Sequence, residues 1–256
     1  MDSLTTKKTI RLFFNNGKVE QFEDELVEEL KLHIHIDDEE YADVIVSSSL
    51  LEEFVLGFLF TRGMINKYDD INTLEIGNGL VSIKRKQPSD KSLPVSSLIE
   101  STGSSNIDTK ELFNLVPGYL ESDFKIKSKV LFRGVNLLSE MPVYRKTGGT
   151  HCAILMSSDG DPIVSAEDIG RHNAVDKCIG GGLKGNADFG KCWIAVSGRL
   201  PSDMVFKAAI SGIPLVASVS AATSGGVEMA EKAGITLVGF TRGNKFNCYC
   251  HCEKIV

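Results

Sequence analysis

Residues 192–240 have the sequence CWIAVSGRLPSDMVFKAAISGIPLVASVSAATSGGVEMAEKAGITLVGF, and this stretch decides the fold. Three short apolar runs, at 192–196, 215–219 and 235–240, alternate with two segments of helical composition. The first helix is expected to begin near Pro201 and end at Gly212, and the second ends at Gly234. This alternation predicts a right-handed βαβαβ unit, in which helices cover a parallel sheet.

A polar loop follows each of these three strands, at 197–199, 223–226 and 241–245. Ligands of open parallel sheets bind at the carboxyl ends of the strands, and helix N-terminal amides attract anions. Glycine permits close backbone approach, and arginine grips phosphate with two hydrogen bonds. The loops together predict a phosphate-bearing ligand, although turn glycines beside solvated arginines would give the same pattern. Neither a Walker A loop nor a GxGxxG fingerprint occurs, which argues against a standard nucleotidase or dehydrogenase.

The segment before this unit predicts two more strands, at 152–156 and 162–165, joined by a turn. A helix is expected over 169–179, with the glycines at 180–182 ending it.

Charged and imidazole side chains are dense from Glu167 to Lys177. If this segment is helical, Asp168, Arg171 and His172 share one face, and His172 pairs with Asp176 four residues on. His172 is then a candidate proton carrier, and the alternative is a hydrogen-bonding residue within a polar network.

The N-terminal part predicts strands at 10–14 and 30–36. The second alternates apolar and polar residues, which indicates a half-buried strand with His33 and His35 on its polar face. Two histidines at this spacing could bind a metal, but the neighbouring sequence offers only Asp37 and Asp38, which are typical of a turn, so a metal site is not expected.

A capping box at Ser49–Glu52 predicts the start of an amphipathic helix that continues through Phe60. The chain is therefore divided into an N-terminal α+β domain over 1–88, a serine-rich flexible loop or linker over 89–125, and a larger domain over 126–256.

The composition of the 256 residues is that of an ordinary globular protein, with 42% hydrophobic and 24% charged residues. A net charge of −6 disfavours nucleic acid as a partner. The polar N-terminus is unlike a signal peptide, and the longest apolar stretch, 50–65, is too short and too charged to span a membrane. These observations predict a cytoplasmic protein with no membrane partner and with reduced thiols.

The C-terminal tail holds three of the six cysteines, at Cys248, Cys250 and Cys252, with His251 among them. In an extended strand the three thiols would share one side and His251 would face away. A zinc site is one interpretation, but structural zinc sites space their cysteines further apart. The other two interpretations are a thiol relay that passes sulfur and a chemically inert tail.

These motifs resemble the formate dehydrogenase accessory sulfurtransferase family, FdhD. The resemblance extends from about residue 25 to the end and is carried by Glu53–Leu59, Thr147–His151, Glu167–Lys177, Ser197–Arg199, residues 208–224 and Gly234–Gly243. It implies an α/β fold, with a C-terminal cytidine-deaminase-like three-layer domain with a mainly parallel sheet beside the smaller N-terminal α+β domain.

The resemblance also implies a function. Family members carry sulfur from a cysteine desulfurase to the molybdenum, or tungsten, bis(guanine dinucleotide) cofactor, which is then inserted into the catalytic subunit of formate dehydrogenase. They form homodimers. The cofactor is cargo, and GDP-like nucleotides serve as its analogues.

On this resemblance, Arg242 and Lys245 would neutralise phosphate with help from Arg199, and the helix start at Ser224 would supply backbone donors. His151 and His172 would position the reactive end of the cofactor. The predicted cofactor-binding residues are Phe240, Thr241, Arg242, Gly243, Asn244, Lys245, Arg199, Thr223 and Ser224.

The sequence departs from the family where members carry a Cys-x-x-Cys motif, since residues 100–106 here are ESTGSSN. Serine cannot carry a persulfide, so sulfur cannot pass through this loop. Either a tail thiol such as Cys250 takes this role, or the protein is a cofactor-binding chaperone without sulfur transfer; whether it is an enzyme stays open. A third hypothesis is a zinc hydrolase using the tail and His151, although the zinc-deaminase signature is missing.

Overall fold

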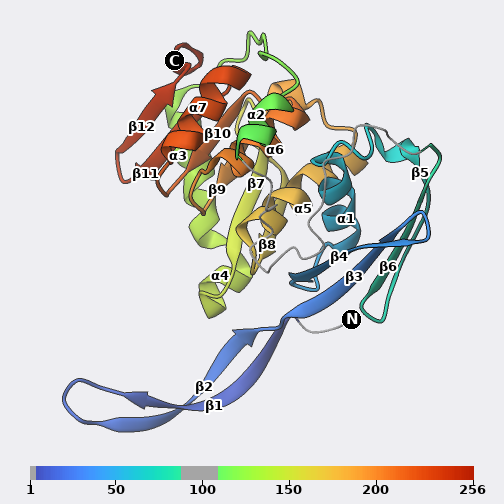
Figure 1. The fold of residues 1–256 in the computed structure, drawn as a ribbon. Helices are drawn as coiled ribbons and strands as arrows, with labels where there is room; N and C mark the ends of the chain where they lie inside the picture. The colour runs from blue at the N-terminus through green and yellow to red at the C-terminus, as the bar shows by residue number, and fades with distance from the viewer. Residues whose placement is uncertain (1–3, 88–108) are drawn as a thin grey trace.

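The computed structural model describes residues 4–87 and 109–256, and its strands form three sheets (Figure 1). A two-stranded ribbon consists of β1 (Thr5–Phe13) and β2 (Val19–Val27). A four-stranded sheet has the order β4-β3-β6-β5, and a six-stranded sheet has the order β12-β11-β10-β9-β7-β8. Residues 100–106, where the family motif is absent, and most of the predicted linker lie outside the described residues.

The six-stranded sheet contains the predicted βαβαβ unit. Its parallel strands β9 (Cys192–Val196), β10 (Leu215–Ser218) and β11 (Thr236–Arg242) alternate with α6 (Ser202–Ser211) and α7 (Ser224–Ala233). The expectation of a mainly parallel sheet is wrong, because the other three strand pairings are antiparallel. The hairpin of β7 (His151–Ser157) and β8 (Pro162–Asp168) pairs through β7 with β9, and β12 (Lys245–Cys250) turns back beside β11.

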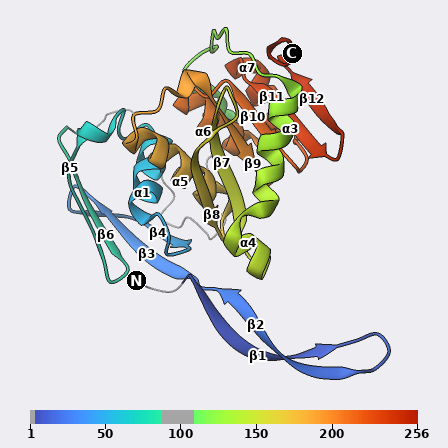
Figure 2. The same ribbon diagram turned by 180° about the vertical axis from the view of Figure 1, so that it is seen from behind.

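Helices cover both faces of this sheet, giving three layers. One face packs against α5 (Arg171–Lys184), α6 and α7. The other packs against α3 (Ser128–Asn136), which Figure 2 shows in front of the sheet. Short helical segments complete the layers: η2 (Leu137–Glu140), α4 (Pro142–Thr147), η3 (Phe189–Lys191) and η4 (Cys252–Lys254). Strands β9 and β10 are buried along their whole length, as expected of strands covered on both faces.

The N-terminal sheet carries the predicted half-buried strand. Leu32, Ile34 and Ile36 of β3 (Leu30–Ile36) are buried against α1 (Leu51–Phe60), and His33 is on the opposite, exposed face. The remaining elements are β4 (Glu39–Val46), η1 (Tyr68–Asp70), β5 (Ile71–Gly77) and β6 (Leu80–Arg85).

The predicted capping box of α1 is wrong. The residue that precedes the helix is Leu50, in the left-handed conformation with φ of 51°, and no side chain caps the first turn. Ser49 Oγ instead contacts Lys177 Nζ, and Glu52 pairs with Lys184, both on α5. Partners distant in sequence therefore displace the local cap that the tetrapeptide predicts.

The two halves of the fold meet where α1 crosses α5. A Cβ on Gly57 would lie 1.9 Å from the carbonyl oxygen of Asp176, and one on Gly180 would lie 1.8 Å from that of Glu53. Only glycine permits this close approach of two helices. The prediction that glycines 180–182 end the helix is therefore wrong, because they lie inside α5, which continues to Lys184.

Part of the predicted linker packs against the C-terminal half. Helix α2 (Thr109–Asn114) buries Leu112 in the core beside α6, and Leu120 N donates to Ala233 O. The domain boundary at 125/126 stays a prediction.

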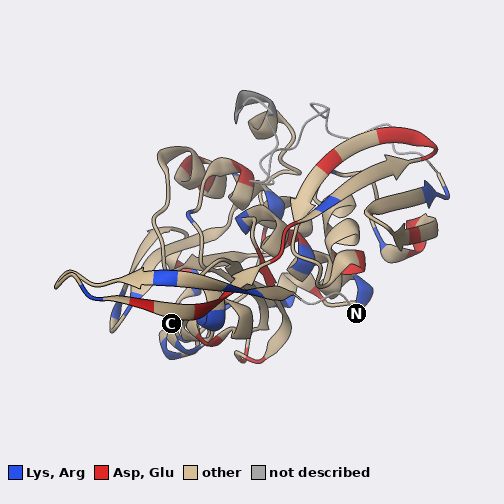
Figure 3. Cartoon of the chain, turned by 90° about the horizontal axis from the view of Figure 1, so that it is seen from below, with Lys and Arg blue, Asp and Glu red and all other residues tan. Residues whose placement is uncertain are grey.

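The β1–β2 ribbon projects from the rest of the molecule and separates charge by strand (Figures 1 and 3). Lys7, Lys8 and Arg11 are on β1, whereas β2 carries four carboxylates. Phe13 and Phe22 are more than half exposed, at 71% and 51%. Within the described residues, no helix is both long and apolar enough to cross a membrane.

Replacing Gly180 by Ala should lower the free energy of unfolding by about 1–3 kcal/mol or more, because the methyl group would overlap backbone atoms of α1. Urea unfolding measures this change. Gly77→Ala is the matched control, since its Cβ would meet nothing within 4 Å. Equal stability of the two variants would contradict the close crossing.

Candidate functional site

Polar side chains gather at one edge of the six-stranded sheet, here called the carboxyl edge. Strands β8, β9, β10 and β11 all run in one direction and end there, and β7 starts there with His151. A bridge between Leu200 and Ala222 joins the loops after β9 and β10. Arg242 Nε donates to Val219 O at 2.8 Å, which ties the end of β11 to the end of β10. The three predicted loops are thus adjacent.

His151 and Ser197 form the centre of this edge. The imidazole Nδ1 is 3.3 Å from Ser197 Oγ, which also accepts the backbone N–H of Cys152 at 2.9 Å. Burial lowers the pKa of His151, and the positive charge of Arg171 lowers it further. His151 is therefore neutral at pH 7, so that it can accept a proton from a ligand.

Two buried polar atoms at this edge have no hydrogen-bond partner among the described residues. One is Nε of Arg171, whose side chain lies against Gly198, and the other is the hydroxyl of Thr241, a residue only 1% exposed. Buried polar groups are nearly always satisfied, and an exception calls for an explanation such as a bound ligand. Both atoms lie beside the predicted cofactor-binding loops.

The end of β11 presents an aromatic ring and a cation together. Phe240 is 40% exposed and has a left-handed φ of 52°, a strained conformation for a bulky residue. Its ring centroid is 6.0 Å from the guanidinium carbon of Arg242. An aromatic ring beside a cation suits a nucleotide, because the base can stack on the ring and the phosphate can pair with the guanidinium.

The other predicted cofactor-binding residues are one helix-capping residue and five exposed residues. Thr223 caps α7 by accepting the N–H of Gly226 at 3.1 Å, so its hydroxyl already has a structural partner. The remaining predicted residues are exposed and are Arg199, Ser224, Gly243, Asn244 and Lys245.

His172 does not pair with Asp176 as the spacing predicts. Its Nε2 lies 2.9 Å from Asp203 Oδ2, on the first turn of α6. The imidazole is fully buried, so it joins α5 to α6 and reaches a ligand only through its neighbours. No sequence pattern points to Asp203 as the partner of His172, because the two residues are 31 positions apart.

Asp168 and Lys177 form a fully buried ion pair at 2.7 Å. Ser47 donates to Asp168 through its backbone N–H and accepts from Lys177 through its hydroxyl. Burial lowers the pKa of Lys177, and the Asp168 charge opposes this shift. The pair neutralises both charges. Its contacts with Ser47, the residue after β4, fasten the N-terminal sheet to α5.

Glu167 is also structural. Its carboxylate accepts the backbone N–H groups of Val143 and Tyr144 at 3.1 and 2.6 Å, in the first turn of α4. A carboxylate at a helix N-terminus satisfies free amides and suits the helix dipole.

Asp176 forms the second buried ion pair, with Lys207 of α6. Lys207 Nζ lies 2.7 and 2.8 Å from the two carboxylate oxygens, and the Thr61 hydroxyl donates to the same carboxylate. Burial lowers the pKa of Lys207 while Asp176 raises it. These contacts connect the C-terminal end of α1 with the middle of α5 and of α6.

The tail is arranged differently from the sequence-based expectation. Cys248 and Cys252 form a disulfide with a Cα–Cα distance of 6.0 Å, which corrects the expectation of reduced thiols. The three thiols do not share one side, because a bulge in the β11–β12 pairing places Cys248 and Cys250 in different core clusters. Cys250 is 8% exposed, and burial raises its pKa to about 11, so it is a poor nucleophile.

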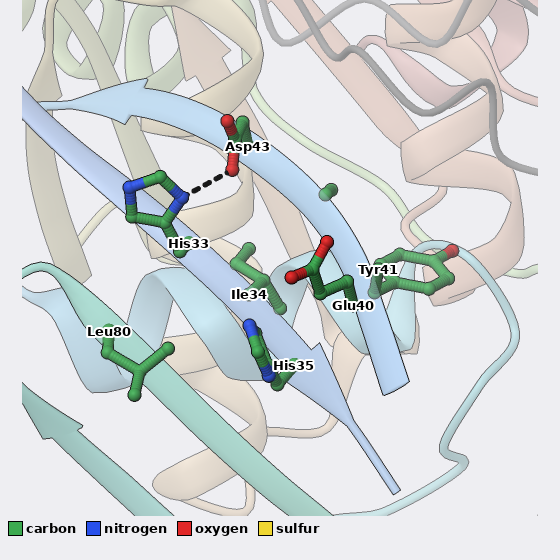
Figure 4. A pocket seen from close by; sticks show the side chains of 8 residues that line it. His33, Ile34, His35, Glu40, Tyr41, Asp43 and Leu80 are labelled. Carbon is green, nitrogen blue, oxygen red and sulfur yellow. Dashed lines mark hydrogen bonds and ion pairs between the residues drawn. The ribbon is translucent and has the colours of Figure 1, made fainter. Parts of the chain in front are cut away.

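A polar hollow of about 560 Å³ lies on the exposed face of the N-terminal sheet (Figure 4). His33 and His35 line it from β3, and His33 Nδ1 lies 2.7 Å from Asp43 Oδ1. Across the described part of the chain, no group of three or more His, Cys, Asp or Glu side chains is arranged to hold a metal ion.

Comparisons with known proteins agree with this fold. The model of the FdhD/NarQ family matches residues 27–256. The sulfur carrier protein FdhD of Thermoplasma volcanium is 34% identical, covering 100% of this chain and 98% of its own. Its counterpart in Methanothermobacter thermautotrophicus is 32% identical, covering 91% and 92%. A crystal structure described as a candidate formate dehydrogenase accessory protein from Desulfotalea psychrophila has a TM-score of 0.82 and 26% identity, covering 99% and 100%.

Replacing Arg171 by Gln should raise the pKa of His151 towards its usual value of 6.5, because one of the positive charges that lower it is removed. NMR titration of the imidazole measures this pKa. Arg199→Gln is the control, because Arg199 is exposed and is not among the charges that shift His151. Identical titration curves for wild type and Arg171→Gln would contradict the geometry of the carboxyl edge.

Replacing Asp176 by Asn should cost about 3–5 kcal/mol of unfolding free energy, because Lys207 would be left buried without its counter-ion. Denaturant unfolding tests this value. Adding Lys207→Met should recover part of the loss, whereas a loss of less than about 1 kcal/mol would argue against a buried pair.

Proposed function

The chain belongs to the FdhD/NarQ family, and on this premise we propose that it acts as a sulfur carrier that serves formate dehydrogenase. Its cargo would be the molybdenum or tungsten bis(guanine dinucleotide) cofactor, held at the carboxyl edge. The observation that carries the cofactor site is the exposed Phe240 ring with the Arg242 guanidinium beside it at the end of β11. The residue between them, Thr241, adds a buried hydroxyl without a partner among the described residues.

The residues of this edge divide the work of binding. The Phe240 ring offers a stacking surface for guanine, with the Arg242 cation beside it. Since Nε of Arg242 already donates to Val219 O, the guanidinium is held in place for phosphate. Arg171 Nε and the Thr241 hydroxyl can each donate a hydrogen bond to the cargo. His151 can take up a proton at the opposite, β7 side of the edge.

The proposal includes partners and setting. A cysteine desulfurase would supply sulfur, the catalytic subunit of formate dehydrogenase would receive the cofactor, and the protein would act as a cytoplasmic homodimer. The three-layer arrangement around the six-stranded sheet supports, as part of the same proposal, a cytidine-deaminase-like assignment of the C-terminal half.

The alternative is a chaperone that binds the cofactor without handling sulfur. It is less well supported, because the relatives in the comparison are named sulfur carrier proteins. The chain also retains two cysteines, Cys248 and Cys252, besides the four buried free cysteines.

GDP should bind at least about tenfold more tightly than AMP, and Arg242→Gln should weaken GDP binding by about tenfold, or roughly 1.4 kcal/mol. The loss arises because Gln lacks the charge that pairs with phosphate. Titration calorimetry at two salt concentrations measures both effects. Arg145→Gln, an exposed arginine on α4, is the control and should bind GDP like wild type. Equal affinity for GDP and AMP would refute the proposed site.

A further inference from the structure

The chain has few thiols that could carry sulfur. All six cysteines lie at or after position 152, so the N-terminal half and the region of the missing family motif contain none. Cys152, Cys178, Cys192 and Cys250 are buried. Burial raises the pKa of each, to about 12 for Cys152 and Cys178 and about 11 for the other two. Because the thiolate is the nucleophile, these four stay inert at neutral pH.

The remaining two cysteines form the Cys248–Cys252 pair. Cys252 is exposed, whereas Cys248 is partly buried and packs against the core cluster under α3. The disulfide encloses only three residues, which makes it a weak restraint on the unfolded chain. An exposed disulfide in so short a loop is better suited to chemistry than to stabilisation.

The fold itself brings the two sulfurs together. After β12 ends, His251 adopts a left-handed conformation with φ of 50°, which turns Cys252 back towards Cys248. The carbonyl of His251 accepts the Thr236 hydroxyl at 2.7 Å, and its ring packs edge-on against Tyr119 with centroids 5.5 Å apart. Its Nε2 contacts Glu231 O at 3.3 Å. These contacts hold the turn independently of the bond between the sulfurs.

The pair lies far from the carboxyl edge. Cys248 pairs with Val238 near the start of β11, whereas Lys245 pairs with Arg242 at its end. Four residue steps of strand separate these two positions, or roughly 13 Å at about 3.3 Å per residue. A sulfur atom bound to the tail cannot reach a cofactor at that edge of the same chain, but a released small species can.

We propose, resting on the sulfur-carrier function above, that Cys252 accepts sulfane sulfur from a persulfide donor and that Cys248 releases it as hydrosulfide. In the first step the Cys252 thiolate attacks the terminal sulfur of the donor persulfide, forming a Cys252 persulfide and freeing the donor thiolate. In the second step the Cys248 thiolate attacks Cys252 Sγ, and the bond to the outer sulfur breaks.

The electrons balance over these two steps. Hydrosulfide leaves with the electron pair of the broken bond, so the sulfane sulfur is reduced by two electrons. The two thiols are oxidised by two electrons to the Cys248–Cys252 disulfide, which is the state that the structure shows. A dithiol reductant must reopen the disulfide before a further turnover, and a single turnover needs none.

A single-turnover experiment tests this sequence. The full-length protein is reduced and freed of reductant, then mixed with glutathione persulfide, and hydrosulfide is measured while peptide mass spectrometry locates extra sulfur and disulfides. Wild type should release about one hydrosulfide per chain and form the Cys248–Cys252 disulfide. Cys248→Ser should keep one extra sulfur on Cys252 and release none above the background of a Cys248→Ser/Cys252→Ser variant.

Control variants separate the tail from the rest of the protein. Cys192→Ser, which removes a buried thiol, should behave like wild type, and Cys252→Ser should neither hold sulfur nor release hydrosulfide. Release from Cys248→Ser equal to wild type, release from wild type no greater than from the double variant, or extra sulfur on Cys250 would each overturn the inference.

GDP titration of the same variants distinguishes failure of the tail inference from failure of the proposed function. Intact GDP binding without tail chemistry would refute the tail inference alone. Tail chemistry without guanine preference would refute the cofactor site alone.

Discussion

The close crossing of α1 and α5 at Gly57 and Gly180 is the constraint on which the rest of the structure depends. Each glycine lies against a backbone carbonyl of the opposite helix, so no larger residue fits without moving the helices apart. At this short separation, Lys177 reaches Ser47 and Thr61 reaches Asp176. The partners of the two buried ion pairs lie on β8, α5 and α6, and Ser47 and Thr61 add hydrogen bonds from the α1 side. An unpaired charge there would be strongly destabilising.

The same crossing fixes the carboxyl edge. Helix α5 begins at Arg171, three positions after the last residue of β8, and its first turn carries His172 towards Asp203 on α6. A shift of α5 would therefore move Arg171 away from Gly198 and change the electrostatic field around His151. The long charged segment from Glu167 to Lys177 is thus largely a fastening between layers, and its N-terminal end contributes Arg171 to the site.

Local patterns predicted the elements that depend on local chemistry. The strand at 192–196 and the helix ends at Gly212 and Gly234 are where the apolar runs and glycines indicate. Features decided by distant partners could not be inferred in this way. In the sequence alone, the glycines at 180–182 resemble a helix terminator, whereas in the structure α1 packs against Gly180 within α5. Ser49 likewise resembles a helix cap, whereas its hydroxyl contacts Lys177. The bulge that separates Cys248 from Cys250 leaves no pattern in the tail sequence.

The position of the thiols has a mechanistic consequence for a chain without the family loop motif. A nucleophile in a mobile loop can travel to the cofactor, whereas Cys252 is fixed by the turn at His251, which is anchored to Thr236 and Tyr119. Under the proposed function, a fixed thiol near the start of β11 would deliver sulfur to the carboxyl edge of its own chain as a species that diffuses. Rigidity of the tail and release of hydrosulfide are therefore linked, because a sulfur that stayed covalently attached there would be separated from the carboxyl edge by the length of the strand.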